Sequence, residues 1–191
     1  MGIGPANLTA YLWWHAEGWL KPGGSMLDIG AQELFCEADP AALNRFIATF
    51  GGEPFPDDEL MRVASRGLAG TAMQRAGLRY SSIDFKPYPF GIVLDLNRDR
   101  LPEGHRGAYD AVTNHGTSEH ILNQWNVFET MHDAAKPGAM MYHCVPFCGA
   151  TPAIGQRAWR PRRFPARSLH SLKERIWEKI YSGKQGGCRV A

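Results

Sequence analysis

Residues 25–35 read SMLDIGAQELF, and this stretch decides the fold. Its first five residues form a short apolar run, which predicts a buried β-strand over residues 25–29. Gly30 follows the strand directly and predicts a tight turn, in which a ligand can approach the backbone closely. Loops that cradle a pyrophosphate are usually richer in glycine than this turn. The turn therefore either holds a cofactor of another kind or simply connects two elements.

The rest of the chain alternates between helix and strand patterns. Helices are expected at residues 8–20, 40–50, 56–77 and 117–135. Further strands are expected at residues 78–85, 90–96, 109–114 and 139–145. Strands separated by helices predict an α/β fold with a doubly wound, Rossmann-like and mostly parallel sheet that has helices on both faces. No further strand pattern follows, so the C-terminal strands are expected to be missing or atypical.

Charge is unevenly distributed along the 191 residues, whose net charge is +2. Residues 1–150 have 11 Lys and Arg against 17 Asp and Glu, and residues 151–191 have 10 against 2. We therefore expect a domain over residues 1–150, with residues 36–77 or so as a helical insertion or lid, and a basic, poorly ordered tail over residues 151–191. The tail leaves nucleic-acid contact open, although no recognisable binding module supports it.

The composition narrows the class of protein. A hydrophobic content of 44% with 21% charged residues is ordinary for a soluble globular domain, and no apolar run is long enough to cross a membrane. Without a secretory signal pattern we expect a cytoplasmic protein with reduced thiols. Cys144 and Cys148 have a CxxxC spacing but no second pair, so we expect no metal. An exposed sheet edge would favour a homodimer.

Polar side chains stand at the carboxyl ends of the predicted strands, where doubly wound sheets bind ligands. In chain order they are Asp28 with Gly30, Asp84, Asp95, and Asn114 with His115. An acidic residue at the end of the second strand can accept both hydrogen bonds from a ribose diol. This series favours a nucleoside-containing ligand. Asp110 lies inside its strand, and we expect it to make structural hydrogen bonds.

Five segments resemble motifs of the class I S-adenosylmethionine-dependent methyltransferases. In that family's order they are MLDIGAQEL, SIDF, IVLDLN, YDAVTNHGTSEHI and KPGAMMYHCVPF, and together they cover about residues 20–148. The resemblance implies S-adenosylmethionine as cofactor, held by Asp28, Gly30, Gln32, Asp84, Phe85, Asp95, Leu96 and Asn114. The segment DIGAQE departs from the family's Gly-x-Gly pattern. A single glycine suffices for this cofactor, because it has no pyrophosphate to cradle.

The resemblance implies methyl transfer to an oxygen or nitrogen of a small-molecule acceptor. This in-line displacement depends on alignment of the reacting atoms in a dry pocket. The candidate catalytic residues are His115 as a base or orienting group, with Glu119 and His120 orienting the substrate. A structural alternative stays open for two of them: Glu119 would complement the N-terminus of a helix capped by Thr117, and His120 would be a hydrogen-bonded core residue.

Two other functions use the same fold. A nicotinamide-dependent oxidoreductase would also place Asp84 on a ribose, but it predicts a Gly-x-Gly-x-x-Gly turn, which DIGAQELF lacks. A binding protein without catalytic activity would keep the fold and the ligand.

Overall fold

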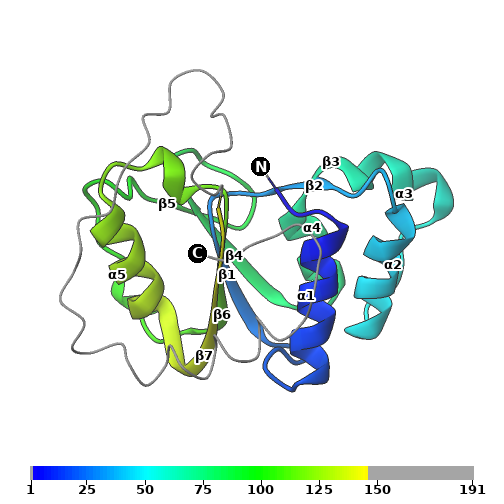
Figure 1. Cartoon of the computed structure of the whole chain (residues 1–191), viewed down its shortest axis with the longest axis horizontal. Helices are drawn as coiled ribbons and strands as arrows, with labels where there is room; N and C mark the ends of the chain where they lie inside the picture. Colours follow the sequence, from blue (N-terminus) through cyan, green and yellow to red (C-terminus); the bar gives the residue numbers. More distant parts are fainter. Residues whose placement is uncertain (1, 146–191) are drawn as a thin grey trace, which may run out of the picture. The chain divides into compact units, whose positions relative to one another are not determined.

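The computed structural model of the chain describes residues 2–145. Its centre is a five-stranded sheet in which each strand runs parallel to its neighbours (Figure 1). The strands are β1 (Ser25–Ile29), β4 (Arg79–Asp84), β5 (Gly91–Val93), β6 (Tyr109–His115) and β7 (Ala135–Cys144). Their spatial order is β5-β4-β1-β6-β7, so the winding reverses between β1 and β6. The doubly wound, Rossmann-like α/β fold predicted from the sequence is confirmed.

Helices cover both faces of the sheet (Figure 1). On one face lie α1 (Pro5–Ala16), α2 (Pro40–Thr49) and α4 (Ala69–Arg75), and on the other lies α5 (Gln124–Ala134). Successive side chains of β1 pack on opposite faces of the sheet, because side chains alternate along a strand. Met26 packs with the α1 side and Leu27 with the α5 side.

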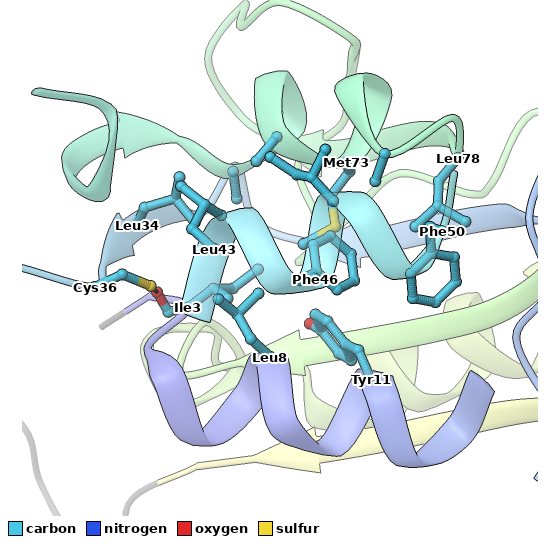
Figure 2. Close-up of a cluster of buried hydrophobic side chains, with 14 of the residues drawn as sticks. Ile3, Leu8, Tyr11, Leu34, Cys36, Leu43, Phe46, Phe50, Met73 and Leu78 are labelled. Carbon is cyan, nitrogen blue, oxygen red and sulfur yellow. Dashed lines mark hydrogen bonds between the residues drawn. The ribbon is translucent and has the colours of Figure 1, made fainter. Parts of the chain in front are cut away.

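The core on the α1 side is rich in large side chains. Figure 2 shows Tyr11 and Leu8 of α1 facing Phe46 and Leu43 of α2. Each of these four side chains is fully buried. Burial of one such side chain stabilises the fold by about 1.5–3 kcal/mol, so α1 is an integral layer of the domain.

The first two helices form where the sequence predicts them, with different ends for the first. Pro5 is at the start of α1, where its fixed φ angle suits the first helical turn, so the helix begins three residues earlier than residue 8. It ends at Ala16, and Gly18 then takes a φ of +76°. In α2, the side chain of Asp39 accepts a hydrogen bond from the N–H of Ala42 and caps the helix.

The prediction of one helix over residues 56–77 is wrong. This segment forms α3 (Asp57–Ala64), β3 (Ser65–Leu68) and α4. The interruption arises because β3 pairs antiparallel with β2 (Glu33–Phe35), a strand that the sequence analysis missed. Arg66 has a φ of +69°, which no helix tolerates, and forms an ion pair with Glu33 on β2. The β1 turn therefore leads into a strand and not into a helix.

The helix predicted over residues 117–135 begins later. Residues Ser118–His120 form one 3₁₀ turn, and α5 starts only after Asn123, whose side chain caps it by accepting from the N–H of Asn126. The strand predicted at 139–145 extends back to Ala135 and ends at Cys144. The strand predicted at 90–96 is reduced to β5, and the six residues between β4 and β5 form no helix.

A cluster of three residues, the amino-end cluster, joins the starts of three neighbouring strands. Asp110 of β6 accepts hydrogen bonds from the backbone N–H (2.8 Å) and the hydroxyl (2.7 Å) of Ser25 on β1. Lys136 of β7 donates to the other oxygen of Asp110 at 2.8 Å. Burial raises the pKa of Asp110, but the bonds from Lys136 and Ser25 outweigh it and lower the pKa to about 2. The structural role expected for Asp110 is confirmed.

Within residues 2–145, no helix is long and apolar enough to cross a membrane. The predictions for the basic tail and for Cys148 fall on residues outside the described range.

Candidate functional site

The carboxyl ends of the strands lie side by side because the strands are parallel and in register. Ile29 of β1 is level with Ile83 of β4 on one side and with Asn114 of β6 on the other. Gly30, Asp84 and the end of β6 therefore occupy neighbouring positions at the point where the winding reverses. Ligands of doubly wound sheets bind at this point.

The β1 turn is tied to the strands on both sides. Gly30 donates its N–H to the carbonyl of Ile83 at 2.7 Å. Its φ is +87°, and a Cβ at this position would lie 2.2 Å from Oγ1 of Thr117. The buried Gln32 donates from Nε2 to the carbonyl of Ile29 (3.0 Å) and to Oγ1 of Thr117 (3.0 Å). The close approach that requires Gly30 is thus made by Thr117, and its predicted contact with a cofactor stays a prediction.

Asp84 ends β4 beside this turn. One carboxylate oxygen accepts the N–H of Ala31 at 3.1 Å and the other accepts the N–H of Lys86 at 3.1 Å. A carboxylate has about four acceptor positions, so Asp84 keeps some for a ligand. The side chain of Phe85, the next residue, is exposed. An acceptor and an exposed aromatic ring therefore stand together at the end of β4, and their predicted contact with a cofactor stays a prediction.

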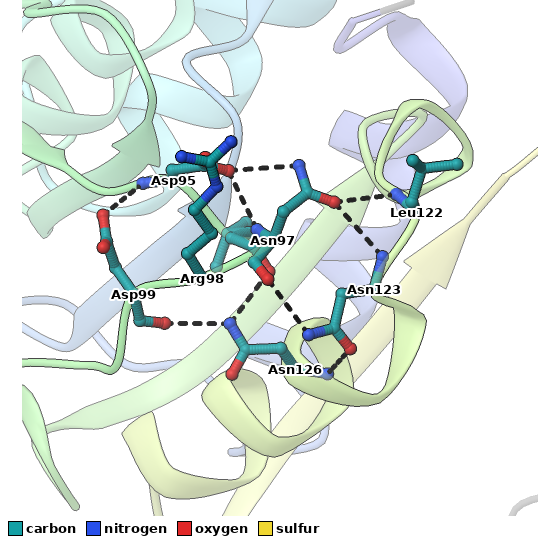
Figure 3. Close-up of polar contacts among 8 residues, drawn as sticks. Asp95, Asn97, Arg98, Asp99, Leu122, Asn123 and Asn126 are labelled. Carbon is teal, nitrogen blue, oxygen red and sulfur yellow. Dashed lines mark hydrogen bonds and ion pairs between the residues drawn. The ribbon is translucent and has the colours of Figure 1, made fainter.

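Asp95 lies after β5 in a polar network that joins this loop to the start of α5 (Figure 3). Its Oδ1 accepts from the backbone N–H and the side-chain amide of Asn97, and these bonds lower the pKa of Asp95. Asn97 Oδ1 in turn accepts the N–H groups of Leu122 and Asn123 at 3.0 and 3.2 Å. Leu96, between the two, is buried in the core. Asp95 stays at the surface, whereas Leu96 does not.

Asp28 lies deeper than the other predicted cofactor ligands. Its side chain is fully buried, and its carboxylate accepts hydrogen bonds from Tyr80 (2.8 Å) and from Thr113. Burial raises the pKa of Asp28 to about 7, although the bond from Tyr80 opposes the shift. The structure thus surrounds this residue with protein hydroxyl groups. Its predicted place in the cofactor shell stays a prediction.

His115 is also buried, and both ring nitrogens have protein partners. Asn7 accepts the N–H of Gly4 with its amide oxygen, so its Nδ2 donates to Nδ1 of His115 at 3.2 Å. The proton of the neutral ring is then on Nε2, which lies 2.5 Å from the hydroxyl of Tyr11. Burial, with the nearby His143, lowers the pKa of His115 to about 3. This arrangement favours a role in holding α1 to the sheet over contact with a substrate.

Tyr11 and Asn7 were not predicted as site residues. They lie 104 and 108 residues from His115 along the chain, and no local pattern links them.

The connection between β6 and α5 holds the remaining candidates. Oδ1 of the buried Asn114 accepts the N–H groups of Thr117 and Ser118, each at 3.2 Å, and so shapes the turn. Both carboxylate oxygens of Glu119 are buried and accept no hydrogen bond from any group of residues 2–145. His120 is more than half exposed, with a side-chain exposure of 58%, so the alternative of a core histidine is wrong. Thr117 does not cap α5 and Glu119 does not lie at its N-terminus, because Asn123 caps that helix.

Among residues 2–145, no group of three or more His, Cys, Asp and Glu side chains could hold a metal ion. Comparison with known proteins finds no matching family model, no matching curated protein and no matching solved structure. The geometry of the carboxyl edge therefore carries the functional argument. Of the predicted site residues, Gly30, Gln32, Asp84 and Asn114 lie together at this edge. Asp95 lies on an adjoining loop. Asp28 and His115 are buried on the face of the sheet that α1 covers.

Proposed function

We propose that this chain is an S-adenosylmethionine-dependent methyltransferase that acts on an oxygen or nitrogen of a small molecule. The observation that carries the proposal is the position of Asp84. Its carboxylate ends the strand next to β1, is oriented by the N–H of Ala31 in the β1 turn, and retains acceptor positions. A carboxylate at this place in a doubly wound sheet suits the diol of a ribose.

The turn after β1 favours this cofactor over a nicotinamide dinucleotide. A dinucleotide needs a glycine-rich turn and a helix N-terminus directed at its pyrophosphate. Here the turn has one glycine, Gly30, and Thr117 occupies the space that a Cβ would need there. The turn then continues into β2. The next helix, α2, starts only at Pro40. S-adenosylmethionine has no phosphate and needs no such cradle, so the oxidoreductase alternative is the weaker proposal.

The roles of the residues follow from their donors and acceptors. S-adenosylmethionine would supply a methyl group on a positively charged sulfur. Asp84 would hold its ribose and Asp95, at the surface of the neighbouring loop, would accept from its adenine amine. Gln32 and the β6–α5 connection would face the amino-acid end. The contribution of these residues to the rate is alignment of the acceptor with the methyl group and exclusion of water.

Calorimetric titration of the full chain with S-adenosylmethionine, S-adenosylhomocysteine and NAD tests this proposal. We expect binding of the first two and none of NAD. Because a hydrogen bond to a charged group contributes about 1.5–3 kcal/mol, Asp84→Asn should weaken S-adenosylmethionine binding by roughly 10- to 100-fold. Asp58→Asn, on the exposed surface of α3, is the matched control and should change nothing.

Three outcomes would count against the proposal or narrow it. Binding of NAD alone would replace it with the oxidoreductase. Unchanged affinity in Asp84→Asn would remove the observation on which it depends. Cofactor binding without turnover, across a broad panel of hydroxyl and amine acceptors, would leave a binding protein of this fold.

A further inference from the structure

The carboxylate of Glu119 has no hydrogen-bond partner within the described part of the chain. Each of its oxygens has less than 1 Å² of accessible surface, and the side chain as a whole is 16% exposed. Nε2 of His120 lies 4.0 Å from Oε1, which is beyond hydrogen-bond distance. Nearly all buried polar groups in native proteins have partners, because a buried carboxylate without donors is costly. This group therefore requires an explanation.

The ordinary structural explanations do not account for it. Glu119 does not compensate a helix dipole, since α5 begins after its own cap, Asn123. Neighbouring backbone N–H groups have other acceptors: those of Thr117 and Ser118 donate to Asn114, and that of His120 donates to the carbonyl of Thr117. The turn is thus complete without the carboxylate.

The position of Glu119 points to a ligand. It lies in the connection after β6, at the edge where the winding reverses and ligands bind. The hydrogen bond between Gln32 and Thr117 fastens this connection to the β1 turn. A buried acceptor is therefore held at the ligand-binding edge by a frame that does not use it.

We propose that Glu119 binds a cationic amine of the ligand at this edge. An ammonium group has three N–H donors and a positive charge, so it can satisfy both oxygens and neutralise the carboxylate. For the source of the amine the inference rests on the proposed function: the amine is the α-ammonium of S-adenosylmethionine or belongs to the methyl acceptor. Because both oxygens are covered, the β6–α5 connection opens to admit the ligand and closes on it.

The variant Glu119→Gln keeps the shape of the side chain and removes its charge. Glu103→Gln, at a side chain that is 93% exposed, is the control. Both variants and the wild type are titrated with S-adenosylmethionine and with 5′-methylthioadenosine, which has the adenosine and the thioether but no amino-acid group. If Glu119 binds the cofactor's ammonium, E119Q should weaken S-adenosylmethionine binding by about 10- to 100-fold and leave 5′-methylthioadenosine unchanged.

A second arm tests the acceptor as the source. Ethanolamine, putrescine and phenethylamine are added to protein saturated with S-adenosylhomocysteine, and binding is followed by saturation-transfer NMR. If the added amines give saturation-transfer signals with the wild type and none with E119Q, the amine that Glu119 binds belongs to the methyl acceptor. If E119Q changes the binding of neither the nucleosides nor the amines, or weakens the binding of both nucleosides equally, the inference is overturned.

The same experiment separates this inference from the proposed function. If the wild type binds no S-adenosylmethionine, the methyltransferase proposal fails. The three amines are then tested on the protein without S-adenosylhomocysteine, and this result alone tests the amine site at Glu119. Loss of amine binding in E119Q would still support the site, and no amine binding to the wild type would overturn it. Thermal unfolding gives an independent readout: E119Q should melt at or above the wild-type temperature, whereas a lower melting temperature would assign Glu119 a structural role and overturn the inference.

Discussion

Replacing Asp28 by Asn should change how the stability of the protein depends on pH. Burial raises the folded-state pKa of Asp28 to about 7, from an unfolded value near 4. Between these two values the folded state binds more protons than the unfolded state, so the free energy of unfolding falls as pH rises. The slope is about 1.4 kcal/mol per pH unit, which amounts to at most about 4 kcal/mol over the window.

Two histidines act in the opposite direction in the same window. Burial lowers the pKa of His115 to about 3 and that of His143 to about 4. Their unfolded forms take up protons first as the pH falls below about 6.5, so they destabilise the protein toward acid. The wild-type curve therefore mixes both effects. The difference between Asp28→Asn and the wild type isolates the carboxyl group, because the histidines are common to both.

The assay is urea unfolding followed by tryptophan fluorescence at pH 4.5, 5.5, 6.5 and 7.5. At the lowest pH the variant replaces a neutral group by a neutral amide that can still bond with Tyr80 and Thr113, so its stability should match the wild type within about 1 kcal/mol. It should then gain about 3 kcal/mol of stability relative to the wild type between pH 4.5 and 7.5. Parallel curves for the two proteins, or a variant less stable at pH 7.5, would refute the reasoning. Asp58→Asn is the exposed control.

Three further substitutions test the frame of the site. Gly30→Ala should destabilise by about 2 kcal/mol or more, because it combines a φ of +87° with a clash at Thr117; the additional change Thr117→Ala should restore part of that loss in urea unfolding. Tyr11→Phe removes the hydrogen bond to the buried imidazole and should cost about 1–2 kcal/mol in the same assay. Asn97→Ala frees two backbone N–H groups, so hydrogen exchange at Leu122 should become faster.

Each of these predictions has a contradicting result. Equal stability of the single and double variants at Gly30 would show that the clash is relieved elsewhere. Unchanged stability of Tyr11→Phe would mean that water replaces the hydroxyl. Unchanged exchange in Asn97→Ala would show that α5 starts independently of the β5 loop.

The sequence predicts the sheet well because its signals are local. Short apolar runs bounded by turns, as in residues 25–35, specify strands, and the helices between β1 and β4 and between β6 and β7 imply that these strands pair in parallel. The break at β3 was not predictable, since it depends on pairing with β2, some thirty residues earlier in the chain. The start of α5 was misplaced for a similar reason: Asn97, from another loop, binds the N–H groups that a helix would have used.

The candidate site is predictable in part. Asp84 and Gly30 stand where a strand-end argument places them, because the argument needs only the strands and their direction. The partners of His115 come from α1, which lies about a hundred residues earlier in the chain, and those of Asp28 come from β4 and β6. Whether a strand-end group faces a ligand or the protein interior is a tertiary property, and residue type alone does not determine it.

Because of the amino-end cluster of Ser25, Asp110 and Lys136, the register of the strands and the recognition of a ligand depend on opposite ends of the sheet. The cluster holds the strands in register at the end opposite to the candidate site, through hydrogen bonds between protein side chains and backbone. Loops at the carboxyl end can then vary in length and chemistry without loosening the register of the strands. A laboratory library that randomises exposed positions of these loops, while retaining the three residues together with Gly30 and Thr117, would start from an intact scaffold.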